Sequence, residues 1–210
     1  MSLAGDAAGN WFYKAGLFSS DGDDEISAFS AGYFALGSLG YDWSGDLDMD
    51  RAQLRLDLVH NEEDEDNNTR DLSTVISLSS QWEHGPWGLW TDLGYGDGYF
   101  DQSDLWGLTV MPFYNQSELV QWVFRYTYID SDDPNGVRFG RYEREIVQGT
   151  DERGDRYEEA YFGLNLFLYG HKLKWQTGLQ YAHMDDVTEP DGSSADHEGW
   201  GITTGLRISW

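Results

Sequence analysis

Apolar and polar residues alternate with a period of two along most of the chain, and no segment repeats with the helical period of about 3.6 residues. The clearest segment runs from Val120 to Tyr128, where bulky residues hold the even positions and Gln121, Arg125 and Thr127 lie between them. This period predicts β-strands that lie between two different environments. Ten segments are expected as strands: 11–18, 29–43, 51–59, 72–82, 87–95, 105–114, 120–128, 160–168, 173–181 and 200–210.

The two alternating sets differ in charge as well as in size. The more apolar set of these ten segments contains no Asp, Glu, Lys or Arg, although 24% of the chain is charged. A soluble β-sandwich also alternates, because one face of each sheet is buried in the core. The alternation therefore predicts an all-β fold and leaves both a sandwich and a membrane barrel open.

The lengths of the connections favour the barrel. Short connections at 45–49, 84–86, 115–117 and 170–172 alternate with long, acidic ones at 19–26, 60–71, 96–104, 130–156 and 185–198. Short turns at one end of the strands and long loops at the other are typical of outer-membrane barrels. We expect one domain over residues 1–210, an antiparallel transmembrane β-barrel of about ten strands with both termini at the short-turn end.

Composition excludes several classes of protein. The net charge of -25 argues against a general attraction to nucleic acid or to anionic lipid. With 10 Trp, 13 Tyr and 10 Phe the chain is too aromatic to stay disordered. It has no cysteine, which excludes disulfides, thiolate catalysis and cysteine zinc sites. The longest uncharged stretch, 26–41, falls short of the ~20 apolar residues of a transmembrane helix, and the N-terminus lacks the features of a signal peptide.

Several motifs resemble one family of porins. They are Arg125-Tyr126-Thr127-Tyr128, the stretches 134–138, 154–157 and 161–165, the hairpin 168–174, the tail 199–207 and Asp104-Leu105-Trp106-Gly107. These residues resemble the phosphate-selective porin O and P family, most clearly after Asp104. The alternating tail that ends in Trp210 looks like the signal by which outer-membrane barrels are recognised for insertion.

The resemblance implies a function and an assembly. Such porins are sixteen-stranded trimeric barrels, so about ten strands would form the C-terminal part of one, and we expect the chain to be a fragment. The implied function is passive diffusion of small hydrophilic solutes, with anions such as phosphate or polyphosphate preferred. Outer-membrane lipid and lipopolysaccharide would surround the barrel, a homotrimer would form if the barrel is complete, and no cofactor or catalytic residue is expected.

If the apolar set faces lipid, the interleaved set lines the channel. Its bases are Lys14, Arg51, Arg55, Arg125, Lys174 and Arg207, and its acids are Asp42, Asp57, Asp92 and Glu159. Inward Arg and Lys would attract anions, including phosphate. Alternatively, these bases pair with inward acids on neighbouring positions and stiffen the wall. The sequence leaves both interpretations open, because the motifs that resemble the family do not show which residues of this chain correspond to its pore residues.

Two further clusters have competing explanations. The acidic run 62–66 could bind divalent cations that bridge lipopolysaccharide, but it lacks the EF-hand spacing, and a solvated charge run is the commoner case. His183 with Asp185 and Asp186, or Asp196 with His197, would suit an outer-membrane hydrolase, although no nucleophile motif accompanies them. A soluble aromatic-rich protein that binds carbohydrate is the other rival. We expect no metal site and no enzyme.

Overall fold

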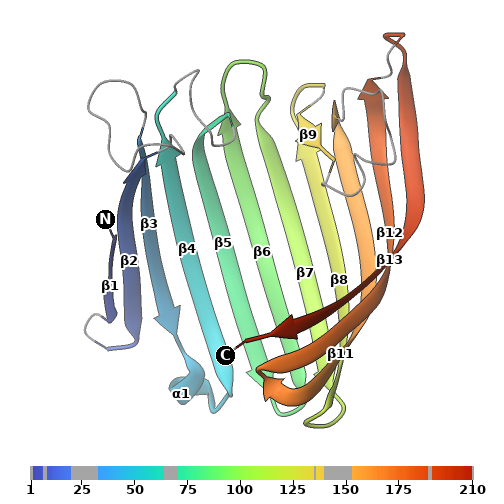
Figure 1. Ribbon diagram of the computed structural model, residues 1–210. Helices are drawn as coiled ribbons and strands as arrows, with labels where there is room; N and C mark the ends of the chain where they lie inside the picture. The colour runs from blue at the N-terminus through green and yellow to red at the C-terminus, as the bar shows by residue number, and fades with distance from the viewer. Residues whose placement is uncertain are drawn as a thin grey trace.

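The computed structural model describes residues 2–6, 9–19, 33–63, 71–134, 136–139, 153–188 and 191–209. Eleven of the described strands form one antiparallel sheet in the order β1-β2-β3-β4-β5-β6-β7-β8-β11-β12-β13 (Figure 1). These strands are β1 (Ser2–Asp6), β2 (Trp11–Ser19), β3 (Tyr33–Asp42), β4 (Arg51–Asn61), β5 (Leu72–His84), β6 (Trp87–Gly98), β7 (Leu105–Asn115), β8 (Val120–Ser131), β11 (Arg156–His171), β12 (Leu173–Thr188) and β13 (Ser194–Ile208).

Two small elements lie outside this sheet. The strands β9 (Val137–Arg138) and β10 (Arg153–Gly154) form a two-stranded sheet in the connection between β8 and β11. The one-turn helix α1 (Ser44–Leu47) lies in the connection from β3 to β4. Neither element interrupts the rule that consecutive strands of the large sheet are neighbours, so the sheet is a simple up-and-down meander.

The expected all-β antiparallel fold is confirmed, and each of the ten expected segments contains a strand of the large sheet. Residues 29–32 of the second segment and Trp210 of the last lie outside the described residues. Three strands were not expected: the short β9 and β10, and β1, which pairs with β2 in the large sheet, from Ser2 opposite Gly16 to Asp6 opposite Phe12. The expectation that ten strands bring the N-terminal end of the chain to the short-turn end was therefore wrong, whereas β13 ends beside the β11–β12 turn, as expected. An eleventh strand starts the chain partway up β2 and runs down to the turn (Figure 1).

The expected distribution of connections is found within the described residues. Apart from the connection 43–50, which holds α1, the connections at one end of the sheet are shorter than those at the other (Figure 1). The two ends are called here the short-turn end and the long-connection end. The C-terminal strands are the longest, with 16, 16 and 15 residues in β11, β12 and β13. They curl around the hollow side of the sheet, so that the end of β13 comes round in front of the sheet (Figure 1).

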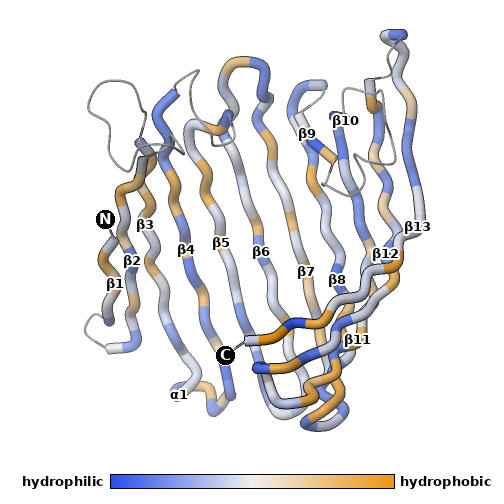
Figure 2. The backbone as a smooth tube through the Cα atoms, viewed as in Figure 1, coloured by the Kyte–Doolittle hydropathy of each residue, from blue (hydrophilic) through white to orange (hydrophobic). Residues whose placement is uncertain are grey.

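Large apolar side chains cover the outer face of this curved layer. The exposed ones include Leu39, Leu56, Leu58, Ile76, Leu78, Leu93, Phe124, Phe162, Leu179, Ile202 and Leu206, and the cross-strand register places all of these on the same face. Their strands appear as alternating apolar and polar bands in Figure 2. No second sheet covers this face among the described residues. A contiguous apolar face of this size needs a lipid or protein partner, unlike the buried face of a soluble sandwich.

Aromatic residues edge this apolar face toward both ends of the strands. Trp87, Tyr114 and Trp122 are cross-strand neighbours toward the short-turn end, while Tyr95 and Trp106 are neighbours toward the other end. The eight-residue step from Trp87 to Tyr95 along β6 spans about 26 Å at about 3.3 Å per residue. Outer-membrane barrels place two aromatic girdles at the edges of the apolar band and cross it with tilted strands of about 9–11 residues, so the strands of this sheet are long enough for such a wall.

The wall is open within the described residues. β1 pairs only with β2, and β13 pairs only with β12, so each has one free edge in this part of the chain. Unpaired backbone groups at such edges are costly in lipid, where no water satisfies them. An isolated wall of these eleven strands would therefore need further pairing at both edges before it is stable in a membrane.

Candidate functional site

All six predicted channel-lining bases lie on the inner face of the sheet. Opposed residues in antiparallel strands share a face. The register links Lys14 to Ser38, Ser38 to Asp57, and Arg55 to Ser79 on the side opposite the exposed apolar residues. Followed across the sheet, it places Lys14, Arg51, Arg55, Arg125, Lys174 and Arg207 on this inner face, together with Asp42, Asp57, Asp92 and Glu159. That these residues line a channel stays a prediction.

Two hollows open on the inner face. The larger, of about 1240 Å³, is lined by Arg51, Arg125, Lys174 and Arg207 among other residues. The smaller, of about 940 Å³, is lined by Lys14, Arg51 and Arg55. The curl of the last strands explains why residues from β4 and β13 border one hollow, although their strands are far apart in the sheet order (Figure 1).

Three of the six bases are paired with acids. Arg55 Nε lies 2.7 Å from Asp57 Oδ2 on the same strand face, and Arg125 Nη2 lies 2.6 Å from Glu159 Oε1 across the β8 and β11 pair. Arg51 Nε lies 3.3 Å from Glu83 Oε1, on the neighbouring strand. Glu83 was not among the acids expected from the sequence. Only the register, which sets Arg51 opposite Glu83, identifies it.

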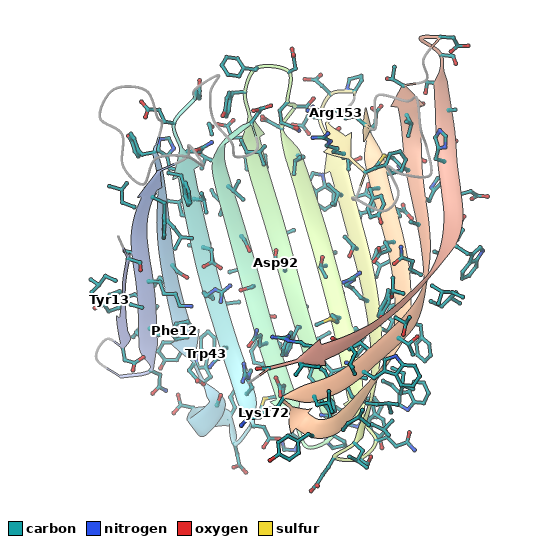
Figure 3. The ribbon with its side chains drawn as sticks, in the orientation of Figure 1. Phe12, Tyr13, Trp43, Asp92, Arg153 and Lys172 are labelled. Carbon is teal, nitrogen blue, oxygen red and sulfur yellow. The ribbon has the colours of Figure 1, made fainter. Side chains whose placement is uncertain are left out.

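The other three bases, Lys14, Lys174 and Arg207, have no ion pair with an acid in the part of the chain that the structure describes. Lys174 stands directly opposite Arg207 in the β12 and β13 register. Like charges in this position repel each other and destabilise the pair of strands. Both residues lie near the short-turn end, where Figure 3 labels the neighbouring Lys172. The expected pairing with inner acids is therefore found for three of the six bases, and the attraction of anions by the other three stays a prediction.

Neutral polar groups continue the wall between the charges. A ladder of amides crosses four strands: Gln121 Nε2 donates to Asn115 Oδ1 at 2.8 Å, Asn165 Nδ2 to Gln121 Oε1 at 2.7 Å, and Gln176 Nε2 to Asn165 Oδ1 at 2.8 Å. Near the middle of the sheet, Asp92 accepts a bond of 2.8 Å from the Ser77 hydroxyl rather than pairing with a base (Figure 3). Charged and amide groups are thus spread across the inner face, beside apolar residues such as Met111 and Phe113, and polar groups of this kind suit a water-filled barrel interior.

Arg125 is the most constrained of the bases. Besides its ion pair, its guanidinium lies 5.2 Å from the centre of the Tyr161 ring, within the range of a cation–π contact. The Tyr161 ring itself lies against Gly163 and Gly178, where a Cβ atom would collide with it. Arg125 Nε is buried and has no hydrogen-bond partner in the structure. Stacking and ion pairing thus fix the direction of this side chain.

A small apolar core lies on the inner face toward the long-connection end. Val137 and Phe139, from the connection between β8 and β11, pack against Met184 and Val187 of β12. The connection is tied further by Gln102, whose Nε2 donates to Gly136 O at 2.7 Å. Residues 136–139 of this connection therefore pack against the inner face. Residues 140–152, between β9 and β10, lie outside the described residues.

The groups considered for a hydrolase are only partly assembled. His183, Asp185 and Asp196 lie together, whereas His197 contacts the Phe139 ring at 6.1 Å between centroids. Among the described residues no serine hydroxyl is hydrogen-bonded to His183, as a nucleophilic triad would require. Of the acidic run 62–66, residues 64–66 lie outside the described part of the chain.

No helix of the described residues is long and apolar enough to cross a membrane. No family model matches the chain, and no curated protein matches it. Membership of the phosphate-selective porin O and P family therefore stays a prediction.

A solved structure, the outer membrane channel DcaP of Acinetobacter baumannii, resembles the chain with a TM-score of 0.53 and 12% sequence identity. The match covers 97% of this chain and 60% of the DcaP chain, so this chain spans less than two thirds of that protein's length. At this identity the likeness concerns the fold alone. Together with the exposed apolar outer face and the charged inner face, it shows that the chain has the fold of an antiparallel transmembrane β-barrel wall.

Proposed function

We propose that this chain forms the wall of an outer-membrane channel through which small hydrophilic solutes diffuse passively, with a preference for anions such as phosphate. The observation that carries the proposal is the contrast between the two faces of one sheet. The outer face exposes apolar residues across the sheet, and the inner face carries the charged and amide side chains that border two hollows. The fold shared with a protein described as an outer membrane channel supports it.

The preference for anions rests on the bases that lack an acidic partner. Lys174 and Arg207 border the larger hollow, face each other across two strands and have no described acid to neutralise them. An anion between them would relieve their mutual repulsion, and Arg can offer a phosphate oxygen pair two parallel hydrogen bonds. The paired bases contribute less, because Asp57, Glu83 and Glu159 balance their charge.

The remaining parts of the proposal rest on the apolar outer face, on the acidic composition and on the resemblance to trimeric porins. The protein resides in the outer membrane with lipid and lipopolysaccharide against its apolar face, binds no nucleic acid, and catalyses no reaction. A complete barrel assembles as a homotrimer. The additional strands that close the wall belong to the proposal as well, because both edges are open within the described residues.

The test is conductance of the refolded full chain in a planar bilayer, with the reversal potential measured across a KCl gradient and with phosphate added as a blocker. The variant Lys174→Gln/Arg207→Gln is compared with Lys172→Gln, which removes a charge from the turn beside the inner face. We expect discrete anion-selective channels, blocked by phosphate, whose selectivity falls in the double variant and persists in the control.

The other outcomes separate the parts of the proposal. Discrete channels with cation selectivity would keep the passive channel and discard the anion preference. A chain that folds stably without detergent and conducts nothing would overturn the channel altogether. A chain that needs detergent but never inserts would show that this wall requires further strands.

A further inference from the structure

Three potential metal ligands converge at the long-connection end of the β12 and β13 hairpin. His183 and Asp185 are two residues apart on β12, so a regular strand presents both to the same side. Asp196 comes from β13, beside the irregularity in register between Met184 and Val187. One ligand atom from each residue lies within 4.8 Å of the other two. Two adjacent strands thus offer one imidazole nitrogen and two carboxylate oxygens to the same point.

Neighbouring groups hold each carboxylate in place. Arg156 forms an ion pair with Asp185 Oδ2, which leaves Oδ1 directed at His183 Nε2, 3.3 Å away. The backbone N–H of Asp186 donates to Asp196 Oδ1 at 3.2 Å. Partners of this kind orient metal ligands and are needed for tight binding. Arg156 occupies only one oxygen of Asp185, so the other remains available to a cation.

The charge around these three residues is mostly negative, which favours the binding of a cation. Glu158 and Glu198 are the cross-strand neighbours of His183 on β11 and β13, and Asp186 adjoins Asp185. Arg156 is the only base that forms an ion pair with this group among the described residues. The site also lies beyond the Tyr181 and Trp200 contact, on the side of the long connections, so it is reached from water rather than from the apolar band.

We propose that His183, Asp185 and Asp196 bind a divalent transition-metal ion, of the class of Zn²⁺ or Co²⁺, that joins β12 to β13 at this end. One imidazole with two carboxylates suits such ions, whereas Ca²⁺ and Mg²⁺ prefer oxygen ligands alone. Three protein ligands leave a coordination position for water, as in an open zinc site. The ion neutralises the crowded carboxylates and restrains the long hairpin, a role independent of conduction through the lumen.

The experiment is a titration of the untagged, detergent-solubilised full chain with Co²⁺, followed by its visible absorption and then by displacement with Zn²⁺. We expect one saturable site whose spectrum disappears when Zn²⁺ is added. His183→Ala is expected to weaken Co²⁺ binding by at least about tenfold, and Asp196→Asn, which keeps the side-chain shape, is expected to do the same. His60→Ala is the matched control, because His60 is an outer-face histidine on β4, far from the site in the strand order.

Every other outcome counts against the site. A folded wild-type chain that binds no Co²⁺ overturns it, and so does a His183→Ala variant that binds as tightly as the wild type. Displacement of Co²⁺ by Ca²⁺ at a comparable concentration would mean binding by acidic surface alone and would also overturn it. If His183→Ala fails to fold, Asp196→Asn decides the question. Bilayer conductance tests the channel separately, so failure of either proposal leaves the other standing.

Discussion

The two ends of the β12 and β13 hairpin carry opposite charge on opposite faces. At the short-turn end the inner face sets Lys174 against Arg207 with no described acidic partner. At the long-connection end, nine residues further along β12, the outer face sets His183 between Glu158 and Glu198. Nine residues correspond to about 30 Å of strand. Between these ends the outer face is apolar.

This difference shows why the net charge of -25 is a poor guide to the lumen. Acids concentrate in the connections, whereas three bases of the inner face, Lys14, Lys174 and Arg207, have no ion pair with an acid among the described residues. A solute in the lumen responds to the side chains within about one Debye length, roughly 8 Å at physiological salt. The local arrangement of Lys174 and Arg207 therefore matters more than the sum over the chain.

The largest expected effect comes from placing a charge in the middle of the hairpin's outer face. Ile202 is 80% exposed there, opposite Leu179. Ile202→Lys is expected to destabilise the lipid-inserted protein by about 2–4 kcal/mol, the cost of a base near the membrane midplane. Urea unfolding in lipid vesicles measures this, with Thr203→Lys on the inner face as the adjacent control.

Equal stability of Ile202→Lys and Thr203→Lys would mean that the two ends of the hairpin are not separated by lipid. Both ends of the hairpin and the outer face between them would then be exposed to the same water. A control variant that is itself strongly destabilised would instead show that the inner face has no wet lumen at this height.

A second, smaller effect distinguishes paired from unpaired bases. Arg125→Ala removes the ion pair of Glu159, whose side chain is only 9% exposed, and leaves it the hydrogen bond of 3.1 Å from the Tyr157 hydroxyl. Because the Arg125 side chain is 40% exposed, water and salt reduce the loss, and we expect about 1–2 kcal/mol of destabilisation. Urea unfolding measures the stability of Arg125→Ala and of Lys174→Ala. The Lys174→Ala variant is expected to be as stable as the wild type or slightly more stable, because it removes the repulsion from Arg207. A Lys174→Ala variant as unstable as Arg125→Ala would show that Lys174 has a partner after all.

A third effect concerns the tight packing on the inner side of the same hairpin. A Cβ atom at Gly178 would collide with the Tyr161 ring, whereas one at Gly205 would meet no atom within 4 Å. Gly178→Ala is therefore expected to cost about 1 kcal/mol, since the ring has to move, and to loosen the Arg125 side chain that stacks on it. Gly205→Ala should unfold at the same urea concentration as the wild type. If the two variants unfold alike, the Tyr161 ring is free to move and does not position Arg125.

The strands were predictable because a period of two is a local property of the sequence. The ten long strands carry bulky residues at alternate positions, and each was found from them. β1 was not predicted, because Ser2-Leu3-Ala4-Gly5-Asp6 holds a single bulky apolar residue. Its pairing with β2 identifies it as a strand. β9 and β10 are too short to show a period at all.

The site was less predictable, because its contacts depend on register and curvature. The alternation was enough to place the six bases on one face, and the spacing of Arg55 and Asp57 indicated their pairing. The partnership of Arg51 with Glu83 required the β4 and β5 register. The approach of Arg51 and Arg207 to one hollow required the curl of the last strands. Likewise, His183 and Asp185 could be paired by spacing, but Asp196 joins them only through the irregular register of the hairpin.

The smallest expected effect is at the tip of the hairpin's long-connection end. Asp191 Oδ1 accepts hydrogen bonds from the Ser193 hydroxyl at 2.6 Å and from the Ser193 N–H at 3.0 Å. These bonds, that of the hydroxyl first, lower the pKa of Asp191 from its usual 3.8. The tip is thus held fully above pH 3.8 and is released as the pH falls through the lower pKa of the folded state. Hydrogen exchange of the Ser193 amide should accelerate in that acid range relative to its intrinsic rate. Asp191→Asn removes the titrating group and should abolish this pH dependence while leaving exchange at the short-turn end unchanged. A transition that persists in Asp191→Asn would assign it to other carboxyls at this end of the hairpin.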